Sequence, residues 1–167
     1  MNRQMLGRLW AMSLGIFAGL VLTMVMMPVH LEGTIYVVDR IAYYKERVPQ
    51  RGDTVVVTTA VFTESGNGGR LVRQVIGIEG DRIQITEGRL QVNGEDVMDL
   101  WGFSEEFPED MEPVRVKKDH VFVLNERIHQ GLDSRSDVVG QTAVEDLWGR
   151  VVYMRKEKRH GTEKALG

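Results

Sequence analysis

A long uncharged run near the N-terminus constrains this chain more than any other feature. No charged side chain occurs from Leu9 to Val29. A helix needs about 20 mostly apolar residues to cross the hydrocarbon core of a bilayer. No polar face recurs at the helical period, which argues against a buried helix of a soluble protein. Residues 9–29 are therefore predicted to form one transmembrane helix.

The charges on either side of this run predict its orientation. Arg3 and Arg8 precede the run, and Glu32 follows it. By the positive-inside rule, residues 1–8 stay in the cytoplasm and the rest of a single-pass membrane protein is exported. A removable signal peptide has a shorter apolar core, of about 7–15 residues, and ends in small residues. This run ends in Met-Val-Met-Met-Pro, which favours an uncleaved anchor.

After the run, the pattern changes from helix to strand. Segments rich in β-branched residues alternate with turn signals such as Glu87-Gly88 and Asn93-Gly94. The expected strands are 35–42, 54–61, 71–78, 82–86, 89–92, 120–125 and 149–154. The sequence therefore predicts a mostly β protein, with one all-β domain carried by one N-terminal transmembrane helix.

The domain is expected to cover residues 30–156 and to face the outside of the membrane. Within it, 99–113 is acidic and contains two prolines, so a surface excursion is expected there. A short turn of helix is expected at 144–149. The charged residues 157–167 are predicted to form a tail outside the domain.

Composition excludes several classes of site and partner. The net charge of −3 gives no reason to expect nucleic-acid binding. Without cysteine the chain has no disulfide, thiol nucleophile or zinc-thiolate site. The four histidines lack metal-ligand spacing, so neither a metal nor another cofactor is expected. The integrin-like triplet Arg51-Gly52-Asp53 is interpreted as a turn that leads into the next strand.

Four segments, in the same order, resemble those of bacterial type I signal peptidases, peptidase family S26. VMMPVHLEG resembles the nucleophile box, and RGDTVVV resembles the strand before the general base. LVRQVIGIEGDRIQITEGRLQVNGEDV resembles the general-base segment with its hairpin, and LDSRSDVVG resembles the Asp-Ser-Arg segment. The resemblance runs from the anchor to about Met154. It implies a signal-peptidase-like all-β fold.

Active members of that family use a serine nucleophile and a neutral lysine base in an apolar environment. Here the resemblance places Val25 at the nucleophile position, Arg73 at the general-base position and Gly131 at the supporting-serine position. Valine has no group that attacks a carbonyl, and arginine stays protonated. The resemblance implies a structural role for Asp133, Ser134, Arg135, Gly80 and Asp81.

The resemblance also implies a groove in which an extended peptide lies along strand edges through backbone hydrogen bonds. The residues expected to line it are Met26, Met27, Pro28 and Val75. Lipid contact is the alternative for the methionines. Alternation along 71–78 places Arg73 on the groove face. Its guanidinium is expected either to pair with Asp133 or to reach solvent over its own stem.

A replacement catalytic pair would have to come from other residues. Thr23 is the hydroxyl nearest the nucleophile box, and His30 is near it in sequence. Ser134 lies in the right segment, but the matching family residue is not the nucleophile. Lys117 and Lys118 lie in a polar stretch and are expected to be solvated.

Two functions compete on this evidence. The first is a non-catalytic, membrane-anchored binding or assembly factor for exported proteins, in which the resemblance suggests partnership with a pilin or a sortase during pilus assembly. The second is an active type I signal peptidase that cleaves signal peptides with an unusual dyad. A soluble, self-cleaving repressor-like protein of related fold is disfavoured by the anchor. The expected partners are an exported or signal-peptide-like segment and membrane lipid.

Overall fold

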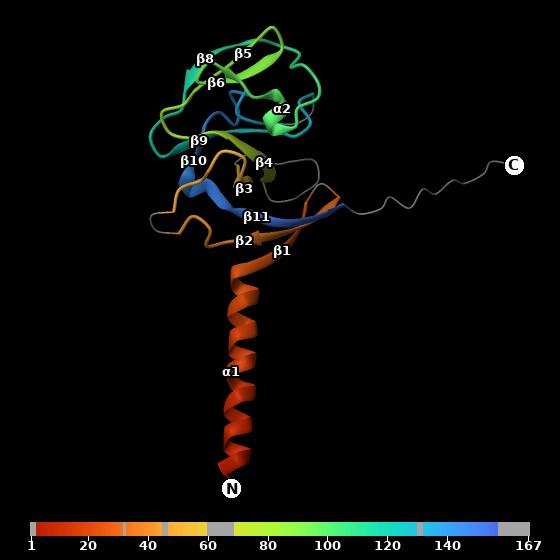
Figure 1. Cartoon of the computed structure of the whole chain (residues 1–167), viewed down its shortest axis with the longest axis vertical. Coiled ribbons are helices and arrows are strands. Elements are labelled where there is room, and N and C mark those ends of the chain that lie inside the picture. Colours follow the sequence, from red (N-terminus) through yellow and green to blue (C-terminus); the bar gives the residue numbers. More distant parts are fainter. Residues whose placement is uncertain (1–2, 32, 45–46, 60–68, 130–131, 157–167) are drawn as a thin grey trace, which may run out of the picture.

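The N-terminal helix α1 (Arg3–Val25) projects away from a β domain (Figure 1). The computed structural model describes residues 3–31, 33–44, 47–59, 69–129 and 132–156. Apolar side chains of α1 from Trp10 to Met24 remain exposed. Among the described residues, no helix combines the length and the apolarity needed to cross a membrane. The transmembrane helix predicted over 9–29 is therefore not found.

The boundaries predicted for this run also need correction. The helix begins before Leu9 and ends at Val25, and the last part of the run forms strand β1 (Met26–Leu31). Strand β2 (Thr34–Asp39) pairs with β1 along its whole length, and the Arg40 N–H donates to the Val25 carbonyl at 3.0 Å. A partner strand thus supplies the hydrogen bonds that a longer helix would otherwise supply.

The first sheet contains strands in the order β1-β2-β11-β3-β4-β9-β10, all paired antiparallel. Its other members are β3 (Thr54–Thr58), β4 (Arg70–Gly77), β9 (His120–Leu124), β10 (Thr142–Ala143) and β11 (Leu147–Lys156). Strand β11, from the end of the described chain, lies between β2 and β3. Strands far apart in sequence are therefore neighbours in space.

The second sheet, in the order β7-β6-β5-β8, lies at the end of the domain far from α1 (Figure 1). Its strands are β5 (Arg82–Thr86), β6 (Arg89–Val92), β7 (Glu95–Asp96) and β8 (Met111–Arg115). Both turn signals fit tight hairpins: Glu87 and Gly88, then Asn93 and Gly94, all have positive φ. A four-residue helix, α2 (Met98–Trp101), follows β7.

The mostly β fold is confirmed, with several local differences. Strands β1, β7, β8 and β10 were not predicted, and β8 begins inside the expected surface excursion and extends two residues beyond it. The helix expected at 144–149 is a single 3-10 turn, Val144–Asp146, after which β11 begins. The expected strand 54–61 ends at Thr58 within the described residues, since 60 and 61 lie outside them.

Strand β3 explains why its sequence has no polar alternation. Val55 and Val57 pack in a cluster with Val75, whereas Val56 packs on the opposite face with Val38. Because both faces of this central strand are buried, its residues are apolar in succession. A third cluster joins the second sheet to β9 and includes Ile83, Leu90 and Phe122.

One glycine allows β11 to pass close to β2. A Cβ atom added at Gly149 would lie 2.6 Å from the Asp39 carbonyl oxygen and 2.7 Å from Val38 Cγ1. Only glycine fits beside that backbone without displacing it.

The interpretation of Arg51-Gly52-Asp53 as a turn is confirmed. The Arg51 side chain binds Asp81, and Asp53 accepts a hydrogen bond from the Tyr43 hydroxyl at 2.8 Å. A Cβ atom at Gly52 would lie 2.7 Å from the Trp101 ring, so the glycine leaves room for the indole. All three residues therefore serve the fold.

Candidate functional site

A groove of about 580 Å³ lies where β2, β3, β4 and β11 face α2 and the segment after β9. We call it the Arg73 groove. Its lining consists of Thr34, Tyr36, Thr54, Val72, Arg73, Gln74, Trp101, Gly102, Asn125, Glu126, Arg127, Met154 and Lys156. These residues combine apolar surface, amides, three hydroxyl groups and charges of both signs.

Arg73 is held rigidly in the wall of this groove. Its residue surface is only 3% exposed, because alternation along β4 directs its side chain inward. Its Nε donates to the Leu132 carbonyl at 2.7 Å, and its Nη1 donates to the Val72 carbonyl at 2.6 Å. The expectation that its head reaches solvent is therefore wrong. A permanent cation is fixed here by backbone acceptors.

Asp133 binds Arg135 in a two-pronged ion pair. Arg135 Nε donates to Oδ1 at 2.9 Å and Nη2 donates to Oδ2 at 2.8 Å. The backbone N–H of Asn125 donates to Oδ2 at 3.1 Å. Arg135 Nη2 also reaches the Ile128 carbonyl at 2.8 Å, and the guanidinium lies over the Phe107 ring. This cluster holds Asn125, a groove residue, in place.

The Asp133 carboxylate thus has Arg135 as its ion-pair partner. Arg73 contacts the carbonyl of the preceding residue, Leu132. Arg73 was expected to pair with the Asp133 carboxylate, and it binds the backbone carbonyl of the residue next to Asp133. Through this hydrogen bond the Asp-Ser-Arg segment supports the groove wall.

Ser134 is committed to strand β9. Its hydroxyl accepts a hydrogen bond from the Val123 N–H at 2.9 Å, and its own N–H donates to the Val123 carbonyl at 2.9 Å. The residue is buried. A hydroxyl in this position bridges the chain to the sheet and is not presented to the groove.

The residues predicted around the nucleophile position lie elsewhere. Val25 ends α1, while Met26, Met27 and Pro28 begin β1 opposite the Asp39 end of β2. The groove instead opens beside Thr34, at the other end of β2, which is roughly 17 Å away along the strand. None of these four residues lines it.

Two further predicted positions also fall outside the groove. Val75 is fully buried in the core beside Val55 and Val123, because its side chain faces the sheet interior. Gly131, at the supporting-serine position, lies outside the described residues.

The proposed replacement residues do not assemble a catalytic pair. The Thr23 hydroxyl donates to the Leu20 carbonyl at 2.8 Å within α1. His30 is exposed on β1, and Lys117 and Lys118 are exposed before β9. None of these residues lines the Arg73 groove.

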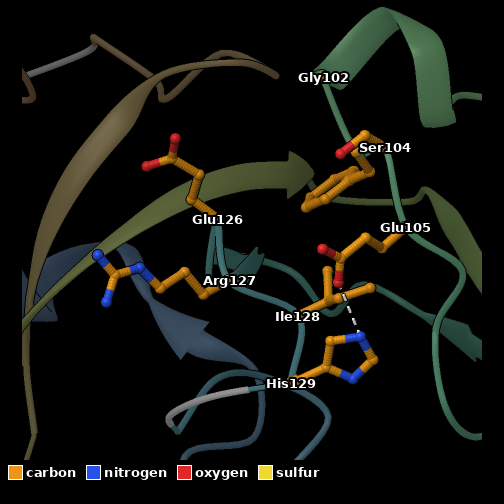
Figure 2. A pocket seen from close by; sticks show the side chains of 8 residues that line it. Gly102, Ser104, Glu105, Glu126, Arg127, Ile128 and His129 are labelled. Atoms are coloured by element: carbon orange, nitrogen blue, oxygen red, sulfur yellow. Dashed lines mark ion pairs between the residues drawn. The ribbon is translucent and has the colours of Figure 1, made fainter.

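A smaller hollow of about 370 Å³ adjoins the groove and shares Gly102, Glu126 and Arg127 with it. His129 Nε2 lies 2.9 Å from a Glu105 carboxylate oxygen at its edge (Figure 2). Figure 2 shows Ser104 set apart from this imidazole, while Glu126 and Arg127 point away from the His129–Glu105 pair. The hollow therefore shows no serine–histidine arrangement for hydrolysis.

Sequence reasoning missed most of the groove lining. Thr34, Tyr36, Trp101, Arg127 and Lys156 come from four separate elements and carry no local motif. Trp101 is the most unusual, because its indole Nε1 is buried and makes no hydrogen bond within the described part of the chain. Only the pairing of β2 with β11 and the position of α2 bring these side chains together.

Gly80 and Asp81 form a structural turn away from the groove. Gly80 has φ of 86°, and the Asp81 carboxylate receives Arg51 Nε at 2.7 Å, the Ile78 N–H at 2.9 Å and Asn93 Nδ2 at 2.9 Å. Burial alone would raise the pKa of Asp81. The hydrogen bonds, chiefly that of Arg51, outweigh burial and hold this pKa below its usual range.

This pKa shift predicts acid sensitivity. Because the folded-state pKa lies below the unfolded value of about 3.9, the ionised carboxylate favours folding. That stabilisation is complete at neutral pH and is lost as the pH falls below about 4 and through the folded-state pKa. Asp81→Asn is expected to lower the free energy of unfolding at pH 7 by about 1.5–3 kcal/mol. Thermal unfolding from pH 7 to pH 3 measures both effects.

A matched control exists at Asp96, whose carboxylate binds Arg89 on the exposed surface of the second sheet. Asp96→Asn is expected to leave the melting temperature nearly unchanged, because exposed ion pairs contribute little. Equal losses in the two variants would contradict the role assigned to Asp81.

The family model for "Signal peptidase, peptidase S26" matches residues 6–155. The chain is 27% identical over 135 residues to thylakoidal processing peptidase 1 of Arabidopsis thaliana, covering 77% of this chain and 38% of the relative. It is 27% identical over 109 residues to a probable signal peptidase I-2 of Synechocystis, covering 62% and 50%.

A third relative, signal peptidase I of Leptolyngbya laminosa, is 27% identical over 120 residues, covering 65% of this chain and 57% of the relative. The chain thus spans between 38% and 57% of the length of these three relatives. A crystal structure of a signal peptidase I from Enterococcus faecalis V583 aligns with a TM-score of 0.48 and 20% identity, covering 64% of this chain and 98% of that one.

Proposed function

The chain belongs to the signal peptidase family, peptidase S26, and from this premise we propose that it binds an extended segment of an exported protein without cleaving it. The binding site in this proposal is the Arg73 groove. The proposal concerns this chain alone.

The observation that carries the proposal is the fixed guanidinium of Arg73. A general base must be able to lose its proton, and arginine does not do so in proteins. Two backbone carbonyls and near-complete burial hold Arg73 at the place where the resemblance expects the neutral lysine. Val25, at the expected nucleophile position, offers no attacking group.

The groove nevertheless has the composition of a peptide-binding surface. Tyr36, Val72 and Met154 provide apolar contact, while the amides of Gln74 and Asn125 can orient a peptide backbone. An exported protein is the proposed client. A pilin acting with a sortase is the specific case that the family resemblance suggests, and it stays a prediction.

Cleavage is the competing function, because the similar proteins are named as peptidases. One arrangement favours it: Thr34 and Lys156 are directly opposite each other on β2 and β11, and both line the groove. A threonine and a lysine could act as nucleophile and base. Lys156 is exposed at the end of β11, however, and lacks the apolar surroundings that a neutral lysine needs.

Binding and cleavage can be measured on the same sample. We expect the full chain in detergent micelles to bind a labelled signal-peptide segment in fluorescence anisotropy. We also expect it to leave an intact preprotein uncut on gels. Gln74→Trp, which places a ring in the groove, should abolish binding, whereas Gln91→Trp on β6 should not, since Gln91 lies outside the groove.

If the wild-type chain removes the signal peptide and Thr34→Val does not, the binding proposal is wrong and the chain is a peptidase. Val25→Ser combined with Arg73→Lys is expected to restore no cleavage, because neither position 25 nor its neighbours line the groove that contains residue 73.

The proposed setting is a membrane surface. Large apolar side chains along α1, including Trp10, Phe17 and Leu22, remain more than half exposed and would be covered by lipid. We expect the full chain to float with liposomes, and we expect this co-flotation to be lost when residues 3–25 are removed. Recovery of the intact chain in the lipid-free fraction would oppose this location. The predicted cytoplasmic N-terminus stays a prediction.

A further inference from the structure

We infer that the Arg73 groove selects client segments that carry an acidic side chain, and that Arg127 and Lys156 read this charge. The inference rests on the proposed peptide-binding function and adds a specificity to it. It names the occupant as an extended segment with an aspartate or glutamate at one position.

Charge complementarity is the first argument. Among the residues that line the groove, Arg73, Arg127 and Lys156 are cationic and Glu126 is anionic. The whole chain carries a net charge of −3, so this surface is opposite in sign to the protein around it. A concave surface with an excess of one charge attracts and orients a segment of the opposite charge.

The second argument is that two of these cations are available for a ligand. Arg127 and Lys156 are exposed, and neither takes part in the ion pairs found between described residues. Figure 2 shows Arg127 directed away from the His129–Glu105 pair, which leaves Glu105 bound to the histidine. Arg51, in contrast, forms an ion pair with Asp81, so its charge is neutralised within the protein.

The three cations of the groove have two different roles: one is structural, and two are placed to bind the client. Arg73 forms the wall, where its hydrogen bonds to Leu132 and Val72 fix it and its charge adds to the local field. Arg127 follows β9 and Lys156 ends β11, so they approach the groove from different elements. A client carboxylate that reaches either cation would receive charge-assisted hydrogen bonds from it.

Trp101 is partly buried, and its buried Nε1 is an additional donor in the same lining. Its Nε1 has no hydrogen-bond partner among the described residues, and a buried donor without a partner is unfavourable. A client oxygen, from a carboxylate or a backbone carbonyl, is the kind of group that would satisfy it.

The test uses the full chain in detergent micelles and two sets of labelled ten-residue peptides, acetylated and amidated at their ends. Each set is built from Ala, Ser and Thr, with one Asp moved along the peptide in the first set and one Asn in the second. We expect the best Asp peptide to bind roughly 3–10 times more tightly than its Asn counterpart, with the ratio falling as salt rises.

Removing positive charge should change the preference for Asp peptides only when the charge lies in the groove. In the double variant Arg127→Gln and Lys156→Gln, the Asp-to-Asn ratio is expected to fall to about one. The matched control, Lys117→Gln with Lys118→Gln, removes the same charge outside the groove and should keep the ratio.

The possible outcomes distinguish the two proposals. If Asp and Asn peptides bind the wild-type chain equally well, or if the ratio survives in the Arg127 and Lys156 variant, the charge inference is overturned while peptide binding stands. If neither set binds at any position, the proposed function fails, and the specificity fails with it.

Discussion

Replacing Asp133 with alanine is expected to destabilise the domain by about 3–5 kcal/mol. The carboxylate is 1% exposed and accepts hydrogen bonds from Arg135 and from two backbone N–H groups. Its removal leaves a largely buried guanidinium without its anion, and buried polar groups without partners are costly. Thermal and denaturant unfolding of Asp133→Ala measure the loss.

The same substitution should reach the groove, because Asn125 and Leu132 are held by this segment. A matched control is Asp137→Ala, which removes an exposed carboxylate four positions later. Its free energy of unfolding is expected to change by less than about 0.5 kcal/mol. If the two variants unfold alike, the Asp-Ser-Arg segment is not the support described here.

Arg73→Glu is expected to cost at least about 3 kcal/mol in free energy of unfolding. The new carboxylate would be buried and would face the Leu132 and Val72 carbonyl oxygens, which now accept from the guanidinium. The negatively charged carboxylate, a hydrogen-bond acceptor, would then face two carbonyl acceptors and repel them. Denaturant unfolding at neutral pH provides the measurement.

Arg82→Glu provides the control for this charge reversal. Arg82 is exposed on β5 and lies directly opposite Arg115 on β8. A negative charge at position 82 should therefore leave stability unchanged or slightly raised. Arg73→Lys, which keeps a cation but loses the planar fork, should fall between the wild type and Arg73→Glu. A stable Arg73→Glu variant would mean that solvent reaches this position.

Much of the β domain could be predicted because its signals are local. Alternation along 71–78 predicts one groove face that carries both Arg73 and Val75, but only Arg73 lines the groove, and Val75 packs in the core. Asn93-Gly94 forms the tight turn that its residue types favour. The turn reading of Arg51-Gly52-Asp53 rests on the same kind of local chemistry. Strand β8 was missed, since Pro113 and acidic residues obscure its pattern.

The uncharged run shows where local pattern misleads. Its hydropathy predicted one continuous helix over 9–29, but Met26–Leu31 forms a strand with β2. Apolar character does not distinguish a helix from a strand over a few residues. The choice depends on a partner strand that local hydropathy does not reveal.

Through the family resemblance, the sequence led to the expectation that Val25 and Arg73 lie at the positions of attack and proton transfer, and neither residue type can perform those steps. It also determined the strands whose alternation or turns are local. Only the tertiary structure decided which side chains share the groove, because Thr34, Trp101, Arg127 and Lys156 meet through non-sequential strand order. Chemistry belongs to single residues, whereas a binding surface depends on contacts between distant parts of the chain.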